Sequence, residues 1–122
     1  MGYASGFTWS VTNAIANTSS TPLYQTCRYG DSFAYQFAVP NGSYTVTLKF
    51  AEPTFAAAGQ RVFNAAINGS AVLTNFDIFA QAGGAYIALD KAFPVTVNNG
   101  QIAIQFTKGP ANSPMVNAIE IR

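Results

Sequence analysis

The sequence has no histidine and a single cysteine, Cys27. Disulfide frameworks are therefore excluded, as are the usual zinc and copper sites and catalytic triads that use histidine as the base. Charged residues make up only 9% of the chain, and its five acidic residues are scattered, so the fold would have to assemble any carboxylate pair for glycoside hydrolysis. We expect a protein that is not an enzyme, and an enzyme using Asp31 or Glu52 is the weakest alternative.

The charge balance and the hydrophobic pattern exclude two further classes of partner. A net charge of +1 provides no basic field for nucleic acid. Hydrophobic residues make up 49% of the chain, yet no run approaches the roughly 18 apolar residues of a membrane helix. The start, MGYASGFTWS, lacks a basic region and an apolar core, so no signal peptide is visible. We expect one domain over residues 1–122, with no nucleic-acid or membrane partner.

What the sequence does contain is a pair of strands around a loop. Apolar and polar residues alternate through Gly42–Phe50, which is the period of a half-buried β-strand. The loop Glu52–Gln60 follows and carries Phe55, which we expect to be exposed. The second strand, Arg61–Ile67, ends at Asn68-Gly69, a dipeptide suited to a tight hairpin turn. These features predict a central hairpin of two core strands around which the chain is built.

Further short strands are predicted before and after this pair. They are Thr8–Val11, Phe33–Val39, Ala71–Thr74, Ala85–Leu89, Phe93–Val97, Gln101–Thr107 and Met115–Ile121, with Asn75–Ala80 as a continuation or edge segment. Glycines and prolines indicate loops at Gln81–Ala85 and Lys108–Pro114, and no segment has the period of a long helix. Short strands at regular spacing indicate an all-β fold, an antiparallel β-sandwich or jelly roll.

Aromatic residues make up 14% of the chain, and several lie in segments expected to be irregular, next to neutral polar residues. They are Tyr3, Trp9, Tyr24, Tyr29 and Phe55. Such rings can stack on the C–H face of a pyranose while Asn, Gln and Arg side chains bind its hydroxyl groups. The alternative is ordinary core filling, with tyrosine hydroxyls reaching water. The residues alone leave both interpretations open.

Other polar residues also have two interpretations. Arg28 and Glu52 lie near predicted strand ends and could pair, most simply as a structural salt bridge. Asn112, in the loop ANSP, either binds a ligand or shapes its own turn. Cys27 is either a buried, inert thiol or an exposed thiol that cross-links two chains. A calcium ion bound by backbone carbonyls and Asp31, Asp77 or Asp90 is a further alternative to a chain without cofactors.

Five ordered blocks, LYQTCRYG, YTVTLKFAE, GQRVFNAAING, NFDI and NAIEI, resemble the malectin-like domain family. The resemblance runs from about Ile15 to the end of the chain. It implies a galactose-binding-like β-sandwich that binds carbohydrate without catalysis. The implied partner is a neutral, glucose-containing oligosaccharide or polysaccharide. Bacterial relatives are typically attached to glycoside hydrolases or cell-surface proteins, which implies an extracellular or cell-surface location in, or derived from, a larger secreted bacterial protein.

The resemblance also implies sugar-binding positions. Tyr29 matches the last tyrosine of the family's YQTxRY block, a stacking position. Thr54 and Phe55 match an aromatic pair, of which only the second ring is kept, and Asn112 matches a late aspartate whose charge is lost here. Tyr3 corresponds to an N-terminal tyrosine. The predicted carbohydrate-binding residues are Tyr3, Tyr24, Tyr29, Thr54, Phe55 and Asn112.

Two departures from the family pattern suggest another function. Family members commonly have glutamate in place of Cys27, and they begin with a strand upstream of Gly2. A sandwich without that strand has an open sheet edge, which is a template for another chain. Met1–Val11 would fold back over this edge, a second copy would pair along it, or a strand of another protein would complete the sheet. The alternative function is therefore a structural or self-assembling protein that forms a homo-oligomer through a sheet edge.

Overall fold

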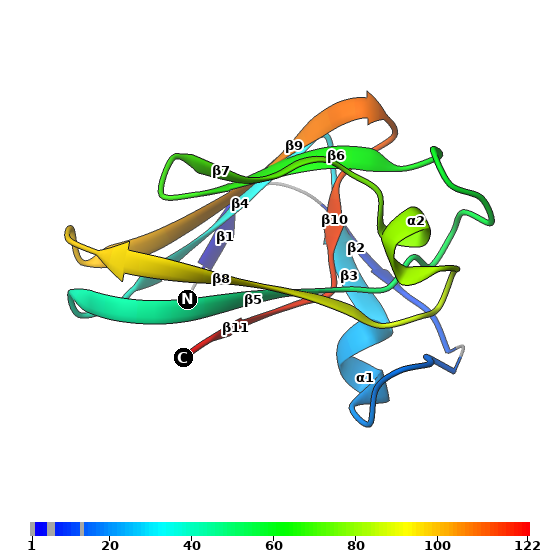
Figure 1. The fold of residues 1–122 in the computed structure, drawn as a ribbon, viewed down its shortest axis with the longest axis horizontal. Helices are drawn as coiled ribbons and strands as arrows, with labels where there is room; N and C mark the ends of the chain where they lie inside the picture. Colours follow the sequence, from blue (N-terminus) through cyan, green and yellow to red (C-terminus); the bar gives the residue numbers. More distant parts are fainter. Residues whose placement is uncertain (1, 5–6, 13) are drawn as a thin grey trace.

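The computed structural model describes residues 2–4, 7–12 and 14–122, with the backbone alone for residues 2–4 and 7. Three antiparallel sheets make up this part of the chain (Figure 1). The largest has the order β1 (Gly2–Ala4), β4 (Ser32–Ala38), β9 (Gln101–Ala111), β6 (Val62–Ile67), β7 (Ser70–Phe76). The second is β11 (Ala118–Ile121), β5 (Gly42–Phe50), β8 (Leu89–Val97), and the third is β10 (Met115–Val116), β3 (Thr26–Tyr29), β2 (Phe7–Ser10). The predicted all-β sandwich is confirmed.

The core lies between the five-stranded sheet and the β11-β5-β8 sheet, which face each other in Figure 1. Val46, Leu48 and Phe50 of β5 are fully buried, as the alternation predicted. Phe50 meets Phe63 of β6 across this space, with ring centroids 5.9 Å apart. Each such side chain contributes about 1.5–3 kcal/mol through the apolar area removed from water.

The predicted central hairpin is wrong, because β5 and β6 belong to opposite sheets. The loop between them, residues 51–61, crosses from one sheet to the other at one end of the sandwich (Figure 1). The alternating pattern predicted two half-buried strands. Each strand does bury one face in the same core, but from opposite sides. The tight turn at Asn68-Gly69 is present, with φ of 48° and 82°, and it joins β6 to β7.

Two predicted boundaries are also wrong. Asp90 and Lys91 do not interrupt a strand, because both pair with β5 in the continuous strand β8. Strand β9 likewise runs through the predicted loop as far as Ala111. Gly109 permits this, since a Cβ there would lie 2.4 Å from the carbonyl oxygen of Val62 on β6. The glycine that suggested a loop thus allows two strands to approach closely.

Two segments for which no helix is predicted from the sequence form short helices. Helix α2 (Ile78–Ala82) begins after Asp77, whose carboxylate accepts a hydrogen bond from the backbone N–H of Ala80, and ends at Gly83 with φ of 88°. It therefore occupies part of the predicted edge segment and of the predicted loop. Helix α1 (Thr21–Tyr24) precedes β3. Neither helix of the described residues is long and apolar enough to cross a membrane.

The predicted last strand divides at Asn117, and its two halves enter different sheets. The Asn117 amide donates hydrogen bonds to the carbonyls of Tyr24 and Thr26 at 3.0 and 2.9 Å. Its oxygen accepts from the backbone N–H of Ala51 at 2.8 Å. Asn117 is therefore a fixed polar junction between α1, β3 and the end of β5.

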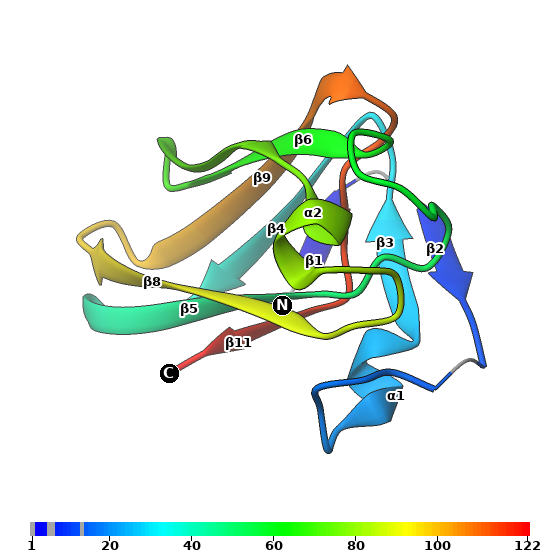
Figure 2. The same ribbon diagram turned by 45° about the vertical axis from the view of Figure 1, so that its right-hand side comes forward.

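The third sheet closes the end of the sandwich at which the loop 51–61 crosses, as Figure 2 shows. Strand β2 confirms the strand predicted around Thr8–Val11 and pairs with β3. Strand β1 pairs with β4, so the described N-terminal residues fold back onto two sheets of their own chain. Homo-oligomerisation stays a prediction.

Candidate functional site

A cavity of about 270 Å³ lies where the third sheet meets two loops. The sheet contributes Trp9, Cys27 and Tyr29, the crossing loop contributes Pro53, Thr54, Phe55 and Arg61, and the β9–β10 loop contributes Asn112 and Ser113. We call it the Tyr29–Phe55 pocket. Four of the six predicted carbohydrate-binding residues line it: Tyr29, Thr54, Phe55 and Asn112. Three segments far apart in the sequence are thus brought together.

The structure places Tyr24 elsewhere. Its side chain is only 4% exposed, and its hydroxyl donates a hydrogen bond to Asp90 of β8. Burial, and then this hydrogen bond, raise the pKa of the Tyr24 phenol to about 12. Lys49 donates to the other oxygen of Asp90 at 2.8 Å, and the pKa of its ammonium group is raised chiefly by that bond. We call these three residues the Tyr24 cluster.

For Tyr3 the structure describes only the backbone, which lies opposite Tyr35 in the register of β1 and β4. This position is in the five-stranded sheet, whereas Tyr29 is in the third sheet. The other predicted positions at the pocket come from β3 and from the two loops. A role of Tyr3 in the same site stays a prediction.

Beneath the pocket, Glu52 forms an ion pair with Arg61 and not with Arg28. The carboxylate is fully buried, and one oxygen accepts a hydrogen bond from Arg61 Nε at 2.7 Å. The other oxygen accepts from the backbone N–H groups of Thr54 and Phe55, at 3.2 and 3.4 Å. Glu52 therefore fixes the conformation of the loop that carries the predicted stacking ring.

Arg61 extends the same network to the second loop. Its Nη1 donates to the carbonyl of Ser113 at 2.6 Å, and its guanidinium carbon lies 5.0 Å from the centroid of the Phe55 ring. Phe55 is accordingly half-buried and not fully exposed as expected. Cation–π contact fixes one face of the ring. One buried ion pair thus holds both loops that form the pocket.

Asn112 has the turn-forming role that the sequence offered as one interpretation. Its backbone has φ of 54°, a left-handed conformation that asparagine tolerates. Its side-chain amide donates a hydrogen bond to the carbonyl of Gln60, which ties the second loop to the crossing loop. Asn112 also lines the pocket, so its contact with a ligand stays a prediction beside this role in the turn.

Cys27 is the buried thiol of the two alternatives, with 6% of its surface exposed. Burial raises the pKa of the thiol to about 11, although the nearby positive charge of Arg61 acts in the opposite direction. The thiol is therefore protonated at neutral pH and poorly nucleophilic. This placement opposes the cross-linking alternative, which requires exposure.

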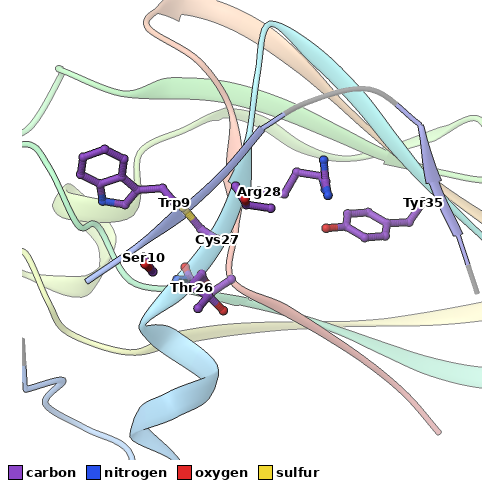
Figure 3. Close-up of a pocket in the computed structure, with 8 residues that line it drawn as sticks. Trp9, Ser10, Thr26, Cys27, Arg28 and Tyr35 are labelled. Carbon is purple, nitrogen blue, oxygen red and sulfur yellow. Dashed lines mark hydrogen bonds between the residues drawn. The ribbon is translucent and has the colours of Figure 1, made fainter. Parts of the chain in front are cut away.

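A second hollow, of about 430 Å³, lies on the other face of β2 and β3 (Figure 3). Arg28 extends from β3 toward Tyr35 of β4, whereas the Trp9 ring points the opposite way. Trp9 and Cys27 border this hollow as well as the Tyr29–Phe55 pocket, and the rest of its lining is Thr8, Ser10, Thr26 and Asn117. Among the predicted sugar-binding residues whose side chains the structure describes, none lines it.

No group of three His, Cys, Asp or Glu residues in the described part of the chain could hold a metal ion. Two of the aspartates considered for calcium have protein partners: Asp77 accepts from Gly59 and Ala80, and Asp90 from Tyr24 and Lys49. Asp31 accepts from Ser113 Oγ at 3.3 Å. Calcium binding stays a prediction that these contacts do not favour.

Five residues of the pocket lining are not among the predicted sugar-binding residues: Trp9, Cys27, Pro53, Arg61 and Ser113. Trp9 was recognised as an aromatic residue in the irregular start but was not assigned to the site, because only the β2–β3 pairing places it opposite Cys27. Arg61 was assigned to a strand and not to the site. Its only sequence signal was charge in a chain with few charged residues, and that signal did not distinguish it from Arg28.

The family model for the malectin domain matches residues 2–119. The chain is 33% identical to Malectin-B of Xenopus laevis and 32% identical to Malectin of Homo sapiens, each over 99% of its length. It spans about half the length of these relatives, 49% and 46% respectively. Receptor-like protein 4 of Arabidopsis thaliana is 37% identical over 67% of the chain.

Solved structures give the same fold. The β-glucuronidase of Bacteroides uniformis matches with a TM-score of 0.86 and 28% identity, over 99% of this chain and 14% of that one. The ANXUR2 extracellular domain of Arabidopsis thaliana matches with a TM-score of 0.83 over 95% of this chain and 38% of that one, at 24% identity, which shows the fold alone. The family match, the relatives and the fold agree: this chain belongs to the malectin domain family.

Proposed function

We propose that this domain is a non-catalytic carbohydrate-binding module that recognises a neutral, glucose-containing oligosaccharide or polysaccharide. The observation that carries the proposal is the meeting of Tyr29 and Phe55 in one pocket, with Thr54 and Asn112 beside them. Aromatic rings offer apolar faces to pyranose C–H groups, and neutral polar side chains offer hydrogen bonds to hydroxyl groups. Membership of the malectin domain family supports the same conclusion.

The electrostatics of the pocket favour a neutral ligand. Arg61 is the only charged residue that lines it in the described part of the chain, and its charge is neutralised by Glu52 at 2.7 Å. A charged sugar would lose its hydrating water on entering the pocket and would find no unpaired opposite charge there, which costs free energy. A neutral glycan meets no such penalty. The affinity of the pocket for a short glycan should be modest, because water competes with the stacking contacts and the few hydrogen bonds.

The environment of Glu52 supports binding without catalysis. Its carboxylate is fully buried, and its two oxygens accept three hydrogen bonds from the protein. A general acid or nucleophile has to reach the reacting bond. Asp31, the other candidate, lies outside the pocket lining. We therefore assign Glu52 to loop positioning and assign no chemical step to the site.

The matched lengths suggest a context for the module. The chain corresponds to 14% of the bacterial β-glucuronidase and to 38% of a plant receptor extracellular domain. We infer that it acts outside the cell or at the cell surface, next to other domains that its ligand binding would bring to a glycan. Its curated relatives are from animals and plants, so the sequence-based expectation of a bacterial source has no support from them.

Titration calorimetry tests the proposal with glucose oligosaccharides of α and β linkage. We expect Tyr29→Ala and Phe55→Ala each to weaken binding by about 1–3 kcal/mol, because a stacking face is lost. Leu23→Ala is the control, since Leu23 is 45% exposed on α1 and does not line the pocket. Unchanged affinity in both aromatic variants would place the binding site elsewhere.

A second candidate function, self-assembly through a sheet edge, rests on β11. Thr45 and Arg122 exchange both backbone hydrogen bonds, at 2.8 and 3.0 Å, so the alternating pattern directs the N–H and C=O groups of Ile119 and Ile121 away from β5. No strand of the described residues pairs on that side. Sedimentation over a wide concentration range tests this: a dimer lost on Ile121→Pro supports assembly through β11, and a monomer throughout refutes it.

A further inference from the structure

Trp9 is the only tryptophan of the chain, and it is 51% exposed. It lies on the edge strand β2, directly opposite Cys27 in the register of β2 and β3. Cys27 and Tyr29 are two residues apart on β3, so their side chains share a face. The same face carries Trp9, which explains why this half-exposed residue lines the Tyr29–Phe55 pocket.

The indole has little role in the core. Large aromatic side chains normally stabilise a fold by burying most of their surface, and Trp9 leaves half of its surface in water. Among described side chains, only Trp9 and Leu23 are large apolar residues with this degree of exposure. Of these two, Trp9 alone lies at the pocket that already contains two aromatic rings.

The size of the pocket shows what the exposed ring can do. A volume of about 270 Å³ is slightly below the usual range of ligand pockets, about 300–1,000 Å³. It can hold only the first part of an oligosaccharide. The rest of the ligand would leave the pocket across its rim, where Trp9 stands on the side of the third sheet.

We propose that Trp9 forms an outer subsite that extends the Tyr29–Phe55 pocket, so that the ligand is an oligosaccharide chain longer than a disaccharide. This inference rests on the proposed function and adds the length of the ligand. The inner rings hold the first sugar residues, and the indole stacks on a residue that projects from the pocket. Affinity should therefore rise with chain length until the outer subsite is filled.

The single tryptophan makes the test direct. Its emission is titrated with α-linked and β-linked glucose oligosaccharides, from disaccharide to heptasaccharide, and calorimetry measures the affinity of each. We expect affinity to rise by about tenfold from the shortest ligand to the plateau, the factor that 1.4 kcal/mol represents. A shift or quenching of the emission should accompany only the longer ligands.

Three variants separate the outer subsite from the pocket. Trp9→Ala should abolish the rise with length, and Trp9→Phe should retain part of the rise and guard against a misfolded alanine variant. Phe55→Ala should weaken binding at every length. If the parent binds none of the series, the proposed function itself fails for glucose oligosaccharides. If the parent binds but the emission is silent and Trp9→Ala keeps the same length dependence, the outer subsite is refuted.

Discussion

The Tyr29–Phe55 pocket and the Tyr24 cluster contain similar parts in different surroundings. The block LYQTCRYG supplies one tyrosine to each, and each contains an ion pair of nearly equal length, 2.7 Å for Glu52–Arg61 and 2.8 Å for Lys49–Asp90. Beneath the pocket the two side chains are 0% and 9% exposed, whereas Asp90 is 45% exposed. The two ion pairs therefore have nearly the same length but differ in their exposure to solvent.

The difference decides what each pair does. Lys49 and Asp90 face each other in the β5–β8 register. Their ion pair therefore links two strands that backbone hydrogen bonds already hold together. Such exposed pairs contribute little, because water screens them. Glu52 and Arg61 instead hold two irregular loops, which are not fixed by the backbone hydrogen bonds of a β-ladder. Burial makes this pair costly to break and gives it control over the pocket.

Breaking the buried pair should have the largest effect. We expect Arg61→Met to lower the free energy of unfolding by about 3–5 kcal/mol, because it leaves the Glu52 carboxylate buried without its cation. Urea unfolding at neutral pH measures the change. The control is Arg122→Met, since Arg122 is 77% exposed in its pair with Glu120. A loss in the Arg61 variant no greater than in the control would show that the carboxylate is not held as described.

Replacing both members of the pair sharpens the comparison by separating stability from binding. Glu52→Leu combined with Arg61→Met should unfold at close to the parental free energy, because apolar residues often substitute for a buried ion pair without loss. Glycan affinity should still fall by about tenfold, or 1.4 kcal/mol. The amides of Thr54 and Phe55 lose their acceptor, and Ser113 loses its donor. Parental affinity in this variant would limit the pair to a stabilising role.

Alkaline pH should act on the Tyr24 cluster. The pKa of Tyr24 is about 12 in the folded state, above its ordinary value of 10.0, so folding favours the protonated phenol. The pKa of Lys49 is raised as well, which acts in the same direction. The stability is present below pH 10 and is lost as the pH rises toward 12. Tyr24→Phe should lose less stability over this range in urea unfolding, and equal losses would contradict the assignment.

The smallest effect is expected at the exposed pair. Asp90→Asn should change the free energy of unfolding by no more than about 1 kcal/mol, because a half-exposed ion pair is screened by water. High salt should abolish most of this difference. Glycan affinity should equal that of the parent, since Asp90 does not line the Tyr29–Phe55 pocket. A loss as large as that of Arg61→Met would remove the distinction between the two regions.

Features that depend only on neighbouring residues could be predicted before the fold was known. Alternation through Gly42–Phe50 identified a half-buried strand, and Asn68-Gly69 identified a turn that needs positive φ. The ordered blocks identified the family. These predictions succeeded because a periodic pattern, a turn dipeptide or a block of residues carries its meaning locally. Sugar binding by Tyr29 and Phe55, which the structure brings to one pocket, stays a prediction.

Which strands share a sheet, and which side chains meet, became known only from the folded chain. Alternation marks one buried face but does not name its partner, so β5 and β6 were predicted as a hairpin although they face each other across the core. Crossing between the sheets brings Phe55 to Tyr29, makes Arg61 the partner of Glu52 and leaves Tyr24 outside the pocket. Such contacts depend on long-range strand pairing, which no short stretch of sequence specifies.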